Sequence, residues 1–410
     1  MKPAPRLGAI FLTVFIDLLG FGIVLPFLAK EARDAFGVSA FVATLLGSVY
    51  SAMQFFFVPV WGRLSDRVGR RPVLLWSIAG TSLSMAALGF GLAWGRSIAW
   101  LFAARAFSGI ATANLGTATA YIADVTRPEE RAKGMGLIGM AFGLGFILGP
   151  GIGGALAEIS IGGRHGPVAC FFAGGLSLIN LVWVTFGVAE SLPPKNRLSK
   201  PPRSLAPLNL EAMRQTFALP GVGLAIAVNF LVVVSFTNLD QTFTFFCADL
   251  FGISERGTGY VLAFIGIVAA GVQGGLVRRL ASRYDEATLM RLGAFIQAVA
   301  FAGLVAAGTA SSRGALYSSG GLLALGNGLT QPTTSAFISR RAPADRQGGT
   351  LGTNQSFASL ARTFGPATGG WLYATYSPRA PYIAASVGMC LALALAMSLR
   401  PRSETRSVDA

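Results

Sequence analysis

The chain alternates long apolar runs with short segments rich in Arg, Lys, Gly and Pro. A helix needs about 20 mostly apolar residues to cross the roughly 30 Å hydrocarbon core of a bilayer. Twelve runs reach that length, which predicts an all-α polytopic membrane protein with twelve transmembrane helices. The expected spans are 7–28, 41–61, 73–94, 97–122, 134–157, 167–188, 221–246, 258–277, 289–308, 314–338, 350–374 and 380–398.

The longest polar stretch, 190–216, is rich in Pro, Lys and Arg and separates six expected spans from the other six. Such a composition is typical of a linker. We therefore expect an N-terminal six-helix half (1–189), a basic cytoplasmic linker (190–216), a C-terminal six-helix half (217–398) and a cytoplasmic tail (399–410).

Composition and charge placement agree with this topology. Charged residues are only 12% of the chain, against about 25% in soluble proteins, and the mean hydropathy is +0.59. If both termini are cytoplasmic, 24 of the 33 Lys and Arg residues lie on the cytoplasmic side and 7 lie outside. This asymmetry follows the positive-inside rule. The net charge of +15 is thus explained by topology, and we expect no nucleic-acid partner.

An internal repeat relates the two halves. Gly149-Pro150-x-x-Gly153-Gly154 recurs 216 residues later as Gly365-Pro366-x-x-Gly369-Gly370. Arg63 and Arg67, after the second span, recur at the same offset, and the loop 127–134 is echoed at 341–349. Three matches in the same order predict two related six-helix units, with a binding site at the midplane between them.

The loop 62–72, GRLSDRVGRRP, carries four arginines and one acid, Asp66. Gly62 and Gly69 permit tight turns, and Asp66 is able to accept hydrogen bonds from Arg67 or Arg131 or to cap a helix. Ser282 stands at the equivalent place in the second half, so a latch built on Asp66 would be one-sided. The expected latch residues are Gly62, Asp66, Arg67, Gly69, Arg70 and Arg131.

Four charged residues lie inside the expected spans, where charge is costly and usually functional. Asp17 and Arg105 both lie near the bilayer midplane, which favours a buried pair or proton relay with Asp17 as the protonatable group; a static ion pair is the alternative. Arg362 is expected to be structural or to face substrate. Asp240, toward the outer end of its span, is either a solvated carboxylate or part of a relay.

Small and polar residues mark two further sets of positions. Small residues recur every fourth position in the fifth span, which allows neighbouring backbones to approach closely; this motif comprises Gly145, Gly149, Pro150, Gly153 and Gly154. Polar residues within spans either line a cavity or form interhelical hydrogen bonds. The cavity candidates are Gln54, Asn114, Asn229, Asp240, Gln297 and Arg362.

Several of these segments resemble the major facilitator superfamily. The loop 62–72 resembles the conserved loop after the family's second helix. The stretch 145–154, GFILGPGIGG, is similar to the motif of proton-coupled drug antiporters, and Arg105 in RAFSG resembles an arginine linked there to proton coupling. Residues 10–155 look like the tetracycline-efflux branch.

This resemblance implies the major facilitator fold, with Asp17 and Arg105 in the proton and substrate path and Gln54 near the drug. It also implies that the latch closes the cytoplasmic side in the outward-open state. Four positions depart from the branch. Ser84 replaces an acid in the third helix, and Ala29 stands where the branch has a second proline at the end of the first helix. Gln273 and Gln297 stand where titratable groups are frequent.

We therefore expect proton-coupled antiport, with efflux of an amphipathic, tetracycline-like drug. The expected partners are the drug, protons and membrane lipid, for a monomer in the bacterial inner membrane with both termini cytoplasmic. We expect no catalytic residues, no metal and no cofactor, with the proton gradient as energy source, because the single His165 and three scattered cysteines form no cluster. A symporter or uniporter for a small metabolite and a non-transporting membrane scaffold are the alternatives.

Overall fold

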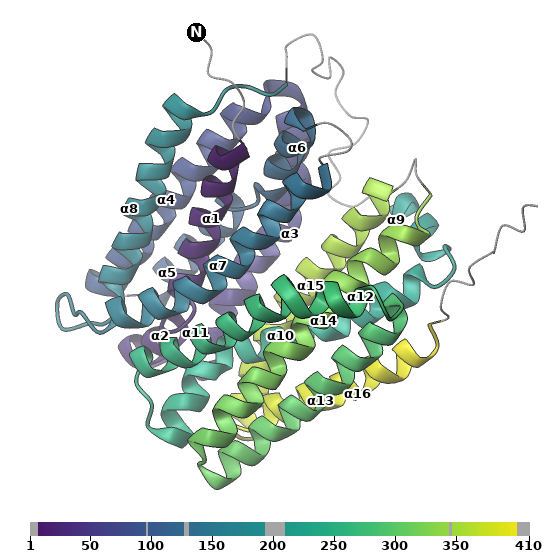
Figure 1. Cartoon of the computed structure of the whole chain (residues 1–410). Helices are drawn as coiled ribbons and strands as arrows, with labels where there is room; N and C mark the ends of the chain where they lie inside the picture. Colours follow the sequence, from purple (N-terminus) through teal and green to yellow (C-terminus); the bar gives the residue numbers. More distant parts are fainter. Residues whose placement is uncertain (1–6, 96, 127–130, 193–209, 344–346, 400–410) are drawn as a thin grey trace, which may run out of the picture.

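The computed structural model describes residues 7–95, 97–126, 131–192, 210–343 and 347–399. These residues form α-helices and their connections, together with one π-helical turn and one isolated bridge between Ile161 and Arg164. Figure 1 shows the N-terminal helices gathered on one side of the molecule and the C-terminal helices on the other. The predicted all-α membrane fold is confirmed.

The helices of the N-terminal half follow the expected spans closely, but the expected span 97–122 is divided into two helices, and a further helix follows the expected span 7–28. The bounds are α1 (Leu7–Val24), α2 (Leu28–Phe36), α3 (Ala40–Val68), α4 (Arg70–Trp94), α5 (Ile98–Ala111), α6 (Leu115–Val125), α7 (Arg131–Ala157) and α8 (Pro167–Gly187).

The C-terminal half repeats this order after a short additional helix, α9. The bounds are α9 (Leu210–Phe217), α10 (Val222–Phe251), α11 (Glu255–Gly271), a π-helical turn (Val272–Leu276), α12 (Val277–Ala281), α13 (Glu286–Ala310), α14 (Arg313–Arg341), α15 (Gln347–Thr375) and α16 (Ala380–Met397).

Among the described residues, eight segments have both the length and the hydropathy to cross a membrane. Two of them, Ile10–Phe36 and Ile98–Val125, each join two helices. The helices α7, α14 and α15 are as long, at 27, 29 and 29 residues. The α11–α12 run, interrupted by its π-turn, completes a set consistent with the expected twelve spans.

Short polar residues begin several helices at the membrane surface. Ser39, Ser254 and Asp285 each accept a hydrogen bond from the backbone N–H three residues later. This satisfies amide groups that have no carbonyl partner in the first turn. The positions at which these helices begin therefore follow from local sequence as well as from hydropathy.

The linker is shorter than expected at its C-terminal end. Residues 210–217 of the region form α9, and the Phe217 ring packs edge-on against Phe357 of α15 at 5.1 Å. Helix α9 thus belongs to the C-terminal bundle. The rest of the linker, from residue 193 to residue 209, the N-terminal residues 1–6 and the tail from residue 400 lie outside the described residues.

The interface between the halves reflects the sequence repeat. Helix α7 of the first half packs on α11 of the second, and α15 packs on α3. The repeat offset of 216 relates α7 to α15 and α3 to the α11–α12 run. Each half thus supplies the same two positions to the interface, as expected for a pseudo-twofold arrangement.

Glycines let the backbones meet at both crossings. A Cβ added to Gly154 of α7 would lie 2.7 Å from the Glu255 carbonyl oxygen, and one added to Gly259 of α11 would lie 2.5 Å from the Pro150 carbonyl oxygen. At the second crossing, a Cβ on Gly370 would collide with Thr44 of α3. Lipid tails are as apolar as leucine, so such close packing is a main source of helix association in a bilayer.

Ion pairs join the halves at the outer end. Arg33 donates to both carboxylate oxygens of Asp249, at 3.1 and 3.3 Å, and Lys30 pairs with Glu255 at 2.5 Å. Glu158 and Arg256 form a longer pair at 3.7 Å. By the predicted topology this end faces the outside, so the molecule is closed there.

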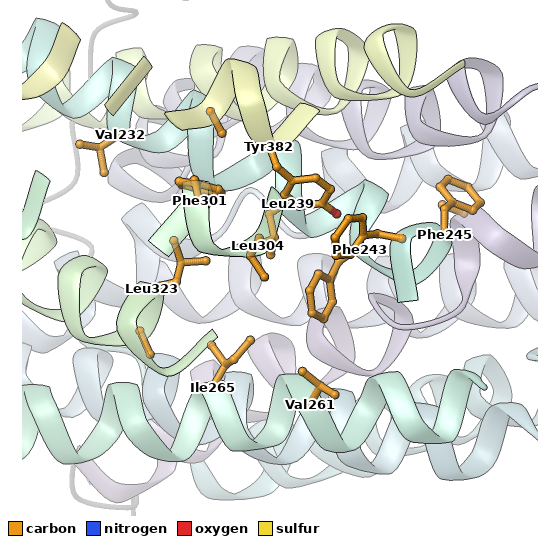
Figure 2. Close-up of a cluster of buried hydrophobic side chains, with 14 of the residues drawn as sticks. Val232, Leu239, Phe243, Phe245, Val261, Ile265, Phe301, Leu304, Leu323 and Tyr382 are labelled. Atoms are coloured by element: carbon orange, nitrogen blue, oxygen red, sulfur yellow. The ribbon is translucent and has the colours of Figure 1, made fainter. Parts of the chain in front are cut away.

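The largest buried apolar cluster includes residues of both halves and is densest in the C-terminal half. Figure 2 shows part of it, with side chains of α10, α11, α13, α14 and α16 directed into a shared interior. Tyr382 is fully buried, and its ring lies 4.4 Å from that of Phe246. The C-terminal half therefore has a densely packed apolar interior.

Replacing Gly154 by valine should open the outer end. The added atoms would meet backbone rather than flexible side chains, and overpacking costs about 1–3 kcal/mol. We expect Thr244→Cys, a buried site bonded to Pro26 across the interface, to react about tenfold faster with an impermeant thiol reagent added outside, in a background lacking the native cysteines.

The matched control is Gly151→Val, because a Cβ there would lie 3.6 Å from the Ala263 Cβ, an ordinary contact. Equal labelling rates in Gly154→Val and in the unmodified background would show that this crossing does not hold the outer end closed.

Candidate functional site

A small pocket lies between the two halves, at the depth where the repeat predicts a binding site. Helices α1, α3 and α5 supply its N-terminal wall, and α10 and α15 supply the opposite wall. Its volume of about 20 Å³ is enough for roughly one water molecule. The residues that give it its chemistry are Phe21, Tyr50, Arg105, Asp240, Gln241 and Arg362.

Arg105 is 3% exposed and lies against α3. Its Nε donates to the Leu46 carbonyl oxygen at 3.4 Å, and its guanidinium carbon lies 4.2 Å from the centre of the Tyr50 ring. Its Nη1 has no hydrogen-bond partner among the described residues. The aromatic ring stabilises the cation, but the guanidinium keeps donor capacity that the protein does not use.

Asp17 does not pair with Arg105. Of the two arrangements predicted for these residues, the direct ion pair is therefore wrong, whereas the proton relay stays a prediction. Asp17 Oδ2 accepts a hydrogen bond from Asn114 Nδ2 at 2.8 Å, whereas Oδ1 is buried without a partner among the described residues. Asn114 lies nine residues after Arg105 in the span formed by α5 and α6, so Asp17 lies level with the α5–α6 break and not with Arg105.

A hydrogen-bond network occupies the same break. Gln54 Nε2 donates to Tyr50 Oη at 3.0 Å and to Thr112 Oγ1 at 3.1 Å, and the two hydroxyl groups lie 2.9 Å apart. Gln54 therefore lies behind Tyr50 rather than directly on the pocket wall. The α5–α6 break thus holds both Tyr50, which covers Arg105, and Asn114, which holds Asp17.

Asp240 and Arg362 both line the pocket from the C-terminal half. Arg362 Nη2 donates to Ser359 Oγ at 2.9 Å, one turn earlier on the same helix. Asp240 is half-buried and not simply solvated, although it lies in the second half of α10. This placement favours a substrate-facing position for Arg362 and a cavity position for Asp240, and both roles stay predictions.

Asn229 and Gln297 are placed elsewhere. Asn229 Nδ2 donates to Asn354 Oδ1 at 3.0 Å between α10 and α15, and Gln297 Nε2 donates to Thr330 Oγ1 at 3.0 Å between α13 and α14. Both amides are buried, at 3% and 0% exposure. Polar residues in spans were expected either to line a cavity or to form interhelical hydrogen bonds. Asn229 and Gln297 form interhelical hydrogen bonds.

The loop 62–72 is more helical than expected. Gly62 lies inside α3, so its predicted turn is wrong: α3 continues about two turns past Gly62, to Val68. Gly69 does form the turn, with φ of 109° between α3 and α4, a conformation that favours glycine.

Arg70 is the centre of the latch region. Its side chain is 9% exposed and pairs with Asp66 at 2.5 Å and with Asp124 of α6 at 3.1 Å. It also donates to Ser65 Oγ at 2.6 Å. Asp66 thus pairs with Arg70, a residue not among the partners expected for it, and the described part of the network joins α3, α4 and α6 within one half.

Glu190 caps the N-terminus of α4, the role considered for Asp66. Its carboxylate accepts from the backbone N–H groups of Arg70 and Arg71 at 2.8 and 3.3 Å. Sequence reasoning missed Glu190 and Asp124, whose only signal was an acid flanking a cytoplasmic loop. The Arg131 side chain lies outside the described residues, and no contact with it is assigned.

The small residues of α7 have two partners. Gly145, Gly149 and Gly153 pack against α1, where an added Cβ on Gly153 would meet the Ile23 backbone. Gly154 faces α11 instead, and Pro150 lies next to it within the helix. The motif therefore holds α7 to its own half on one side and to the other half on the next.

Arg70→Ala should destabilise the protein, since it leaves Asp66 and Asp124 without their cation. Hydrogen bonds to charged groups contribute about 1.5–3 kcal/mol each, so we expect a loss of about 2–3 kcal/mol and a lower Tm of the purified protein. Arg340→Ala is the control: that arginine is 67% exposed and pairs with Glu286, and exposed pairs contribute about 0–1 kcal/mol. Equal Tm values for the two variants would contradict the central role of Arg70.

The chain matches known transporters over its whole length. It is 31% identical over 413 residues to the class C tetracycline resistance protein of Escherichia coli, covering 100% of both chains. It is also 29% identical to major facilitator superfamily domain-containing protein 10 of Bos taurus, covering 99% of this chain and 96% of the relative.

Solved structures have the same fold. The crystal structure of the human organic anion transporter MFSD10 superposes with a TM-score of 0.71 at 25% identity, covering 95% of this chain and 98% of that one. A bacterial homologue of the lysosomal transporter Spinster, inward-facing and unoccupied, gives 0.74 at 18% identity, with 95% of each chain covered. The sequence profile of the Major Facilitator Superfamily matches residues 10–366 and 307–410. The chain is a member of the Major Facilitator Superfamily of membrane transporters.

Proposed function

We propose that this transporter exports a small amphipathic compound from a bacterial cytoplasm in exchange for protons. The observation that carries the proposal is Asp17, a membrane-buried carboxylate with one oxygen held by Asn114 and the other without a partner among the described residues. A carboxylate kept at this depth is costly and can take up and release a proton. The full-length similarity to a tetracycline resistance protein supports the direction of transport.

In this proposal the halves 1–189 and 217–398 rock about the midplane pocket. With the outer end closed, the pocket would be served from the cytoplasm, where the compound enters. Opening of the outer end would then release the compound and admit a proton to Asp17. No cofactor takes part, and the proton gradient supplies the energy for a monomer whose termini are both cytoplasmic.

Transport should depend on a pH gradient. In everted membrane vesicles acidified inside, we expect tetracycline to accumulate in vesicles containing the transporter, because protons leaving through it drive the compound inward. The measurement is uptake before and after a protonophore collapses the gradient. Uptake that is unchanged by the protonophore would refute antiport.

Asp17→Asn should abolish gradient-driven accumulation while leaving gradient-independent exchange intact, because the amide keeps the bond geometry but carries no titrating proton. Accumulation and counterflow, measured in the same proteoliposomes, separate these two activities. Glu286→Gln is the control, since Glu286 pairs with the exposed Arg340 away from the interface between the halves. Full accumulation by Asp17→Asn would make Asp17 structural.

A second candidate is symport or uniport of a metabolite. It is favoured by Ser84, which is 1% exposed in α4 at a position where the efflux branch has an acid. It is also favoured by the comparable similarity to major facilitator superfamily domain-containing protein 10. The direction of proton movement decides between the candidates: antiport moves protons against substrate, whereas symport moves them with it.

A further inference from the structure

We propose that the central pocket binds the anionic head group of its substrate, and that Arg105 and Arg362 form a two-sided guanidinium clamp for it. This inference rests on the proposed transport function and narrows its substrate class to amphipathic carboxylates, sulfonates and related organic anions.

The first step is the charge of the pocket wall. Arg105 comes from α5 of one half and Arg362 from α15 of the other, and Asp240 is the one carboxylate among the lining residues. The described lining therefore carries a formal charge of +1. Asp17 is not among the lining residues, and its carboxylate contacts Asn114 rather than either arginine.

The second step is the state of the two guanidinium groups. Among the described residues, no carboxylate oxygen lies within 4.0 Å of either one, since the ion pairs lie at the outer end, around Arg70 and at Arg340. Arg105 uses Nε on a carbonyl oxygen and leaves Nη1 unbonded at 3% exposure. Arg362 bonds only a serine hydroxyl of its own helix.

The third step is energetic. A buried cation with unused donors carries a large desolvation cost unless an anion completes it. A carboxylate or sulfonate fits the planar fork of arginine with two parallel hydrogen bonds. Asp240 partly offsets the two cations but does not contact them as an ion pair, so a bound anion is the group that completes the site.

The fourth step concerns the rest of the substrate. The Phe21 and Tyr50 rings stack at 5.4 Å on the N-terminal wall, and Pro366 lies on the opposite wall. These surfaces suit an aromatic or aliphatic body. Because the pocket now has room for about one water, the halves must separate at this level to admit a substrate, which then holds the two arginines together through its head group.

The test uses three ligands with the same apolar body: naphthaleneacetate, naphthaleneacetamide and naphthylethylamine, which are anionic, neutral and cationic at pH 7. Binding to the purified full chain is measured by calorimetry without a proton gradient. We expect the carboxylate to bind at least about tenfold more tightly than the amide, which corresponds to about 1.4 kcal/mol, and the amine to bind most weakly.

The variants report on each charge separately. Arg105→Gln and Arg362→Gln should each raise the Kd for the carboxylate by a larger factor than the Kd for the amide, and Arg362→Lys should fall between. Asp240→Asn should act in the opposite direction and tighten carboxylate binding. The control Arg340→Gln, on the exposed cytoplasmic end of α14, should change nothing.

Equal affinity for the three ligands, preference for the amine, or absence of saturable carboxylate binding would overturn the proposal. If an arginine variant does not fold, Asp240→Asn decides, because unchanged or weaker carboxylate binding in it contradicts the clamp. Proton-driven export of tetracycline by a protein that prefers amines would overturn the clamp but leave antiport standing. Preference for the anion without gradient-driven transport would overturn antiport but leave the clamp standing.

Discussion

The structure depends on backbone contact between the two halves. In a bilayer there is no apolar driving force to bring helices together beyond what lipid already offers, so packing distance decides which helices associate. Gly154 and Gly259 at one crossing, and Gly370 against Thr44 at the other, bring α7 to α11 and α15 to α3. The ion pairs of Lys30 and Arg33 lie beside these crossings and add charge complementarity to a contact that small residues make possible.

The crossings also determine where buried charge is tolerated. Arg105, Asp240 and Arg362 lie on the interface rather than toward lipid, so their surroundings change when the halves move. Asp17 lies within one half, held by Asn114. Asp17, the group suited to carrying a proton, is thus separate from Arg105 and Arg362, the groups suited to binding an anion. The α5–α6 break and Tyr50 lie between them. Any coupling between proton and substrate therefore has to act through a change in the position of these helices.

Hydropathy and the internal repeat predicted the fold well because both arise from local constraints. The spans follow from bilayer thickness, and the repeat of Gly149 at Gly365 predicted which helices occupy equivalent positions. The expected turn at Gly62 was wrong because the apolar pattern ends where α3 leaves the membrane, whereas the helix continues in water to Val68. Hydropathy indicates which part of a helix lies in lipid, but not the residue at which the helix ends.

The site was predicted less completely, since depth in a span does not tell which way a side chain points. Asp17 and Arg105 were expected at similar depths, yet Asp17 contacts Asn114, which lies nine residues after Arg105 along the same span. Asn114, Asn229 and Gln297 were alike by composition, and all three bond neighbouring helices rather than line the pocket. Glu190 and Asp124 contact Arg70 only because the chain folds back over more than fifty residues, a contact that no local pattern encodes.

Helix α3 has the proportions of a lever. It meets α15 at Thr44, contributes Tyr50 to the pocket, and continues to Asp66 at the cytoplasmic face. At 1.5 Å per residue, Tyr50 lies about 9 Å and Asp66 about 33 Å from that contact. A tilt about the contact that widens the pocket by about 1 Å would therefore carry the far end through about 4 Å, so a displacement at pocket level would be about four times larger at the far end of α3.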